Sequence, residues 1–215
     1  MLPASQIPSL VGPDGRLPSR QQAARRLVLG RVRQEEVAGE FRAQIERVLA
    51  AGIEVDHLDS HCHLHAHPTV WRALREVVEE TGIRRVRRSE ARPGIDFLHA
   101  TLRRRVLGIG ITLASRFSRR APEPSLRSPD RFLGLVRSGE IDAGWICQAI
   151  RSLEPGSVTE LMLHPGDGDV FPGLSEDHAP EQRRRELEAA LAPQVRETLE
   201  ACNVELTTYR QVTPC

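Results

Sequence analysis

Five of the chain's eight histidines lie within eleven residues, in the sequence HLDSHCHLHAH at positions 57–67, beside an aspartate. Imidazole side chains serve as metal ligands, as proton carriers near neutral pH, or as an expression tag. A tag is excluded because the run is internal and is interrupted by other residue types. The cluster therefore indicates metal binding or proton transfer.

The residues before the cluster, IEVDHLD at 53–59, alternate apolar and polar side chains, which predicts a strand that runs into the histidines. Because side chains alternate faces along a strand, four polar residues would share one side. These residues are Asp59, His61, His63 and His65. Ligands gather at the carboxyl ends of strands in α/β folds, so the pattern predicts a pocket at this strand end.

His164 holds the same kind of position, at the end of a second predicted strand, SVTELMLHPG at 157–166. Two such strand ends predict one shared pocket that brings residues 61 and 164 together. From its position we assign His164 as a general acid, or as the donor on the oxyanion side, when a bond to substrate breaks.

Simpler roles stay open for several of these residues. Any one of His57, His65 and His67 fits a capping or surface histidine better than a ligand. Asp59 either orients a histidine by accepting its second N–H or caps the following turn. A buried histidine at a strand end, such as His164, can also simply hydrogen-bond to the backbone.

The rest of the chain predicts helices that alternate with strands, which indicates a parallel βαβ architecture of the α/β class. Apolar residues recur every three to four positions in residues 19–50, and Pro68 and Gly82 mark the ends of another helix. Other helices are expected at 99–120, broken by Gly108 and Gly110, at 128–139, at 140–156 and at 181–201, interrupted by Pro193. Other strands are expected at 83–88 and 203–212.

The composition describes one globular domain with little net charge. The chain has 215 residues, a formal net charge of +1 and four cysteines without a C-x-x-C pair. A zinc knuckle or a disulfide framework is therefore not expected, and a reducing cytoplasm fits best. No apolar stretch approaches the roughly 20 residues that span a bilayer, and the first residues do not form a secretion leader.

An Arg-rich insert occupies about residues 84–131, which hold thirteen arginines. The chain contains no lysine, so arginine supplies every basic Lys or Arg side chain. The segment therefore fits a solvated surface in an Arg-biased protein. A peripheral contact with an anionic membrane is the other interpretation, because basic amphipathic helices lie on membranes. Nucleic acid is not an expected partner, because aromatic residues make up only 4% of the chain and none forms a stacking platform.

Two motifs together resemble one protein family. DHLDSHCHLH at 56–65 and ELMLHPG at 160–166 are similar to the paired motifs of the YdjC-like (ChbG) carbohydrate deacetylases. IPSLVGPDGRLPS at 7–19 resembles that family's loop after its second metal-binding strand, and TTYRQV at 207–212 its terminal strand. PDRFLGLVRSG at 129–139 most resembles the hopanoid-biosynthesis-associated branch, HpnK.

The resemblance implies a distorted (β/α) barrel that uses a divalent metal, Mg or Zn, to remove an acetyl group from an N-acetylated sugar or glycolipid. For the HpnK branch, the implied substrate is an N-acetylglucosaminyl hopanoid. His61 matches one of the family's metal ligands, which are one Asp and two His. Asp59, His63 and His65 would then orient rings around the metal or contact substrate.

The family's DDFG segment and its GLH or GMH segment, which supply the other two ligands, have no counterpart in this sequence. We therefore expect residues 1–215 to form a single, N-terminally truncated YdjC-like domain. Its fold would be an incomplete, distorted (β/α) barrel that lacks the first strands, and the chain alone would be inactive because hydrolysis needs a polarising cation and an activated water.

Two other functions stay open. The chain fits a non-catalytic carbohydrate- or lipid-binding remnant of the same fold. It also fits a metal hydrolase of the amidohydrolase type, in which an H-x-H strand end likewise binds metal but further ligands follow on later strands. A homodimer is left open by the sequence.

Overall fold

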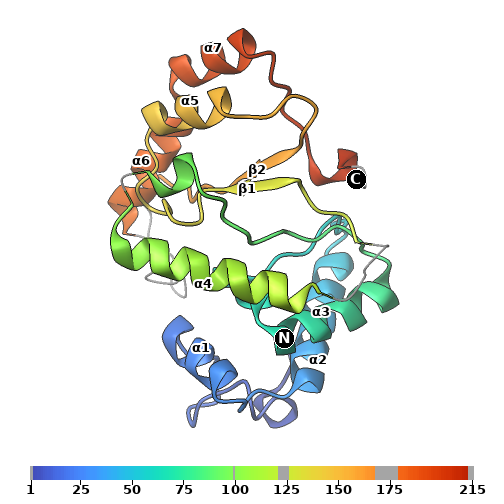
Figure 1. Cartoon of the computed structure of the whole chain (residues 1–215). Coiled ribbons are helices and arrows are strands. Elements are labelled where there is room, and N and C mark those ends of the chain that lie inside the picture. The colour runs from blue at the N-terminus through green and yellow to red at the C-terminus, as the bar shows by residue number, and fades with distance from the viewer. Residues whose placement is uncertain (1, 99, 121–125, 168–178, 213–215) are drawn as a thin grey trace. The chain divides into compact units, whose positions relative to one another are not determined.

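The computed structural model describes residues 2–98, 100–120, 126–167 and 179–212 (Figure 1). The chain divides into two compact units. Unit 1 comprises Met1–Ser89, Ile111–Ser128 and Tyr209–Cys215, and unit 2 comprises Glu90–Gly110 and Pro129–Thr208. One helix, α4 (Leu102–Ser118), runs from the second unit into the first.

Unit 1 is built on three helices, α1 (Arg20–Val28), α2 (Gln34–Ala50) and α3 (Pro68–Thr81). Figure 1 shows α2 and α3 side by side, and they pack through a shared apolar core. The core residues recur at helical spacing, as the sequence predicts; they include Leu27, Val37, Ile45, Val70 and Val77. Pro68 at the first position of α3 and left-handed Gly82 at its end confirm the predicted boundaries.

The amino-terminal segment is irregular, as its prolines and glycines predict, and contains one short 3₁₀ helix, η1 (Ala4–Gln6). Two buried carboxylates of α2 hold it. Glu40 accepts a hydrogen bond of 2.9 Å from the backbone N–H of Leu2, and Glu36 accepts one of 2.7 Å from that of Ser9. Because buried carboxylates need such donors, the segment and α2 stabilise each other.

The strands predicted at 53–59 and 83–88 are wrong in extent. The two segments meet only at an isolated parallel bridge between Leu58 and Val86, and a second bridge joins Arg85 to Arg127. Leu58 bonds to Arg85 and Arg87 on either side of the bridge at 2.9 and 3.0 Å. The pairing ends there because the chain turns into a 3₁₀ helix, η2, at His61.

Unit 2 contains a two-stranded parallel sheet of β1 (Arg131–Leu133) and β2 (Thr159–Leu161). Phe132 pairs with Glu160 at the centre of the register. Just beyond β1, Gly134 has a φ of +98°, and a Cβ there would lie 2.6 Å from the carbonyl oxygen of Met162. Only glycine therefore allows the chain to leave β1 so close to the end of β2.

Helices α5 (Ala143–Arg151), α6 (Pro180–Leu191) and α7 (Pro193–Ala201) complete unit 2, and Figure 1 shows α5 beside the strands. A second apolar core forms around α5 and includes Trp145, Ile146, Ile150, Ala189 and Val195. Pro193 begins α7, which confirms the predicted interruption. A 3₁₀ turn, η3 (Ile95–Phe97), lies in the segment before α4.

Three further predictions from sequence are corrected. The helix expected at 128–139 is β1 followed by turns, because Gly134 and Gly139 adopt positive φ there. The strand expected at 203–212 is an exposed, irregular segment that ends in η4 (Tyr209–Gln211). Helix α4 is not broken at Gly108; a Cβ there would lie 2.3 Å from Val136, so glycine permits close packing instead.

The described residues thus form a mixed α/β structure with parallel strands, and within them no barrel closes. The predicted incomplete α/β fold is confirmed in this sense. The single-domain organisation stays a prediction.

Candidate functional site

The histidine cluster does not form a strand end. His61–Ala66 make η2, and Cys62 and His63 adopt left-handed backbone angles, with φ of 55° and 58°. This conformation is uncommon for residues other than glycine, although asparagine, aspartate and histidine adopt it more often than other types. The alternating-face argument for Asp59, His61, His63 and His65 is therefore wrong, because the chain coils: His61 is exposed, whereas His63 and His65 are buried.

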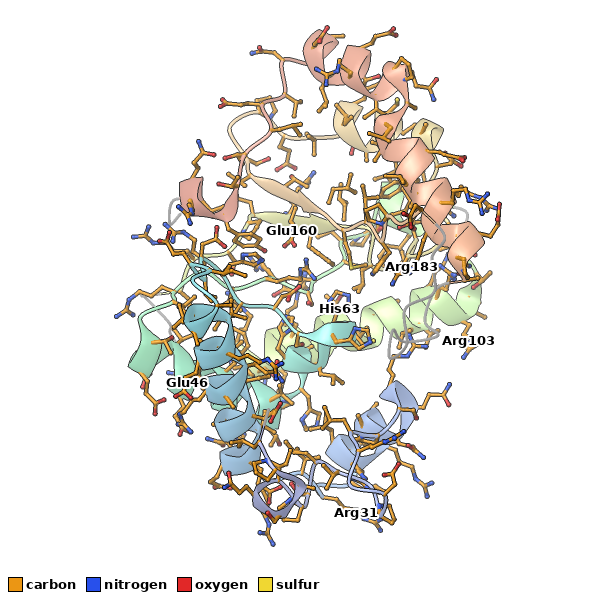
Figure 2. The ribbon with its side chains drawn as sticks, turned by 180° about the vertical axis from the view of Figure 1, so that it is seen from behind. Arg31, Glu46, His63, Arg103, Glu160 and Arg183 are labelled. Carbon is orange, nitrogen blue, oxygen red and sulfur yellow. The ribbon has the colours of Figure 1, made fainter. Side chains whose placement is uncertain are left out.

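Four side chains form a hydrogen-bonded chain through the buried part of the cluster. The hydroxyl of Ser60 lies 2.7 Å from Nδ1 of His65, and the hydroxyl of Ser89 lies 3.0 Å from Nε2 of the same ring. Ser89 is also 2.8 Å from Nδ1 of His63, which Figure 2 labels on its turn of 3₁₀ helix. Ser89, fully buried, thus bridges two histidines from a segment 24 and 26 residues further along the chain.

Both rings are held in place by this chain. When Ser89 donates one hydrogen bond and accepts the other, the protons run in one of two directions. In the first, His63 donates to Ser89, Ser89 donates to His65, and His65 donates to Ser60. The second reverses every donor. Either way both nitrogens of the His65 ring are engaged by hydroxyls, so His65 acts as a structural residue and is not available as a metal ligand.

Burial lowers the pKa of His65 to about 4. The negative charge of Asp59 opposes this effect, and the positive charges of Arg87 and Arg119 add to it. Hydroxyl partners do not favour the charged ring as a carboxylate would. His65 is therefore neutral across the physiological range.

The remaining polar groups of the cluster have separate partners. Asp59 forms a short ion pair with Arg87, and Nδ1 of His57 lies 2.6 Å from a carboxylate oxygen of Asp56. The His57 ring also stacks on Tyr209 at 4.0 Å. His67 accepts a hydrogen bond of 3.3 Å from the backbone N–H of Thr69, which confirms the capping role at the start of α3.

His164 in unit 2 has a different kind of partner. It follows β2, and its Nδ1 lies 3.6 Å from Oε2 of Glu186, a residue of α6 whose side chain is fully buried. The same carboxylate accepts backbone N–H groups of His164 at 2.6 Å and of Gly139 at 2.7 Å. The hydroxyl of Ser138 lies 3.5 Å from Nδ1 of the ring. The ring is thus oriented by a buried negative group.

The charge of Glu186 is favoured in spite of its burial. Burial acts to raise the pKa of its carboxyl, but hydrogen bonds from the ring of His164 and from two backbone N–H groups outweigh it, so the pKa lies below the ordinary value. The carboxylate thus places a negative charge beside the imidazole of His164. The predicted role of His164 as a proton donor stays a prediction.

The comparison with family models decides the family. The model described as YdjC-like protein matches residues 1–201. The chain belongs to the YdjC-like protein family. This YdjC-like chain is also similar to proteins named carbohydrate deacetylase: it is 29% identical to one from Geobacillus stearothermophilus over 214 residues, covering 97% of the chain and 71% of that protein.

Two further comparisons agree. A carbohydrate deacetylase from Brevibacillus brevis is 25% identical over 213 residues, which cover 98% of this YdjC-like chain and 73% of that protein. A solved structure from Enterococcus faecalis V583, of a protein proposed to cleave cellobiose phosphate, superposes with a TM-score of 0.73 at 22% identity. The match covers 98% of this chain and 71% of that one, and it shows that the fold is shared.

The structure places the predicted site residues of the YdjC-like chain in both units. Asp59, His61, His63 and His65 lie in unit 1, and His164 lies in unit 2. The shared pocket that would join residues 61 and 164 stays a prediction. Within the described residues, no three His, Cys, Asp or Glu side chains converge as a metal site, so these residues do not by themselves fit a bound cation.

Sequence reasoning missed the partners of the histidines. Ser60 stands inside the cluster, and its type allows a hydrogen bond to a ring, but Ser89 lies in RRSEARP, which carries no such signal. Glu186 lies in RRRELEAAL, where it resembles any solvated helix carboxylate. Only the folded chain shows that these side chains are buried against histidines.

Proposed function

We propose that this chain carries the hydrolase chemistry of a carbohydrate deacetylase, the removal of an acetyl group from an N-acetylated sugar. Two kinds of observation support the proposal. The family match extends over residues 1–201, and relatives similar to nearly the whole chain are named for this activity. The single structural observation that carries it is the contact of His164 with the buried carboxylate of Glu186.

His164 moves the proton in this proposal. Cleavage of the amide bond leaves an amine that must gain a proton, and the imidazole of His164, oriented by a carboxylate, can supply it. Glu186 holds the Nδ1 side of the ring, so Nε2 gives the proton to the leaving nitrogen. The hydroxyl of Ser138 also contacts the ring of His164. The backbone N–H of Gly139 donates to the carboxylate of Glu186 and so helps to fix it beside that ring.

A divalent metal, Mg or Zn, is part of the proposed chemistry, where it would polarise the acetyl carbonyl. His61 is exposed at the start of η2, and we propose it as one ligand. The remaining ligands would come from outside the part of the chain that the structure describes, because no ligand set converges within it. The chain alone is then inactive.

The proposed substrate is an N-acetylglucosaminyl group on a hopanoid, based on the resemblance of residues 129–139 to the HpnK branch. A cytoplasmic location, a homodimer and peripheral contact of the Arg-rich segment with a membrane complete the proposal. A carbohydrate- or lipid-binding remnant without activity is the second candidate, and the lack of a converging ligand set in the described residues favours it.

The test is to fuse this chain to the residues of the Geobacillus stearothermophilus deacetylase that it does not match, and to measure acetate release. N-acetylglucosamine oligosaccharides and an N-acetylglucosaminyl lipid serve as substrates, with Mg²⁺ or Zn²⁺ added. The fused protein should release acetate and the unfused chain should not. A fused protein that folds but is silent, while the intact relative is active in the same assay, would favour the binding remnant.

A further inference from the structure

Helix α4 buries small or polar side chains and exposes large apolar ones. The buried positions on this helix are Gly108, Thr112 and Ser115, which are small or polar. A helix on the surface of a globular protein normally buries its large apolar residues and exposes polar ones. In α4 this arrangement is reversed.

Five of the six exposed large apolar residues of α4 form a stripe along its exposed side, and the sixth, Leu107, lies outside it. At 100° per residue, their spacing of four, three, four and four positions keeps them within about 80° of the helix circumference. Between 48% and 78% of the surface of each is exposed. The residues of this stripe, called the apolar stripe below, are Leu102, Val106, Ile109, Leu113 and Phe117.

The contacts inside each unit confirm which side faces the protein. In unit 2, Arg104 donates to the backbone carbonyls of Val136 and Ser138 at 3.3 and 2.9 Å. In unit 1, Ser118 donates to the carbonyl of Ala66 at 2.8 Å, and Arg119 lies 4.9 Å from the ring centre of Trp71. All three anchoring residues project from the side opposite the apolar stripe.

Arginines flank the stripe, and no acidic residue lies anywhere in α4. The flanking positions are Arg103 on one edge and Arg105 and Arg116 on the other; Figure 2 labels Arg103 at one end of the helix. Arg120 lies over the ring of Phe117, 4.9 Å from its centre. The exposed side therefore combines an apolar ridge with positive charge on both edges.

We propose that this side of α4 docks onto an anionic lipid surface, with the apolar stripe below the headgroups and the flanking arginines among the phosphates. An exposed apolar stripe of this kind marks an interaction site, and the positive edges match anionic headgroups. A second copy of the chain fits less well, since paired stripes would bring arginines against arginines.

The geometry of the helix agrees with a lipid surface. No described helix is long and apolar enough to cross a membrane, so α4 would lie in the plane of the interface. The inference rests on the membrane contact in the proposed function and deepens it by naming the surface and its lipid class; the proposed deacetylase activity is tested separately by acetate release.

The experiment is co-sedimentation of the full chain with two kinds of vesicle. One kind contains phosphatidylcholine alone and the other contains phosphatidylcholine and phosphatidylglycerol in equal parts. The chain should bind only the anionic vesicles, and high salt should weaken the binding. The double variant Ile109→Glu, Leu113→Glu should bind at least about tenfold more weakly. The control is Val28→Glu, which changes an exposed apolar residue of α1 and should bind as the parent does.

A second double variant, Arg103→Gln with Arg105→Gln, keeps the test valid if the glutamate variant does not fold. It should weaken binding about tenfold or more, because each arginine near the surface contributes about 1 kcal/mol. Failure of the parent chain to bind anionic vesicles would overturn the proposal. So would a dimer in solution that Ile109→Glu, Leu113→Glu dissociates without any change in vesicle binding.

Discussion

The two histidine regions of the chain differ in the partners that surround the rings. In unit 1, His63 and His65 are buried and meet the hydroxyls of Ser60 and Ser89. In unit 2, His164 is partly exposed and meets the buried carboxylate of Glu186. Burial lowers the pKa of His65, so this ring is uncharged, whereas the carboxylate of Glu186 places a negative charge beside His164.

The difference indicates a division of labour. A neutral ring with both nitrogens hydrogen-bonded is suited to hold the cluster in shape, so that its exposed member, His61, has a fixed position. A ring beside a buried negative group is suited to carry a proton. The same residue type thus meets hydroxyl partners in one unit and a carboxylate in the other, and the proton-donor role of His164 stays a proposal.

The largest effect is expected from pH acting on His65. The unfolded ring gains a proton near pH 6.5 and the folded ring only near pH 4, so between these values the unfolded chain holds more protons and acid favours unfolding. The free energy of unfolding should fall by up to about 3 kcal/mol over this range. Denaturant titrations at several pH values measure it.

The variant His65→Gln isolates this contribution. It removes the titrating ring, so the pH dependence between 6.5 and 4 should become shallower, whatever the variant's stability at neutral pH. An unchanged slope would show that the ring of His65 is not held neutral by burial.

The next largest effect is expected from a change of Glu186, the buried carboxylate beside His164. Glu186→Gln leaves one of two backbone N–H groups without its acceptor and removes the charge beside His164, so the free energy of unfolding should fall by about 2 kcal/mol. Folding lowers the pKa of Glu186, so its carboxylate stabilises the folded chain above pH 4.5. This stabilisation is lost as pH falls through the lowered pKa of the folded state. Stability of the variant should vary less with pH in that acid range than stability of the parent. Equal acid dependence in both proteins would contradict a stabilised carboxylate.

A smaller effect should follow from Ser89→Ala, which breaks the bridge between two rings. Both rings lose a buried partner, and the expected loss is about 1 to 2 kcal/mol by denaturant unfolding. Ser157→Ala, which removes an exposed hydroxyl in unit 2, is the matched control and should change stability by less than about 0.5 kcal/mol. If both changes have the same small effect, the hydrogen-bonded chain does not hold the cluster.

The smallest effect is expected at Asp59, whose ion pair with Arg87 is partly exposed. Asp59→Asn should lower the free energy of unfolding by less than about 1 kcal/mol, because solvent screens such pairs. Denaturant unfolding in low and high salt measures the effect. A loss of several kcal/mol would mean that Asp59 is part of the buried network.

Much of the helical structure could be predicted from the sequence, because its signals are local. Pro68 and Gly82 bound α3, and Pro193 separates α6 from α7. The strands were harder to predict, since pairing at single residues such as Leu58 depends on partners far along the chain. The 128–139 segment was mistaken for a helix because its apolar residues do not distinguish a three-residue strand with turns from a helix.

The candidate site could be predicted only in part. Histidine type and spacing single out residues 61–65 and His164, and their functional roles stay predictions. The left-handed backbone of Cys62 and His63 could not be foreseen, because this conformation is a minority one for both residue types, even though histidine adopts it more often than most. Ser89 and Glu186 become partners only through tertiary packing, and no short-range pattern indicates them.

The most direct test of this division of labour is the substitution His164→Ala in the fused protein, with turnover and metal content measured on the same sample. General acid catalysis contributes about a hundredfold or more to rate. The account predicts that acetate release falls by about that factor while the bound metal stays at the parent's level. Parallel loss of turnover and metal would contradict it, because His164 would then act at the metal rather than as the proton donor.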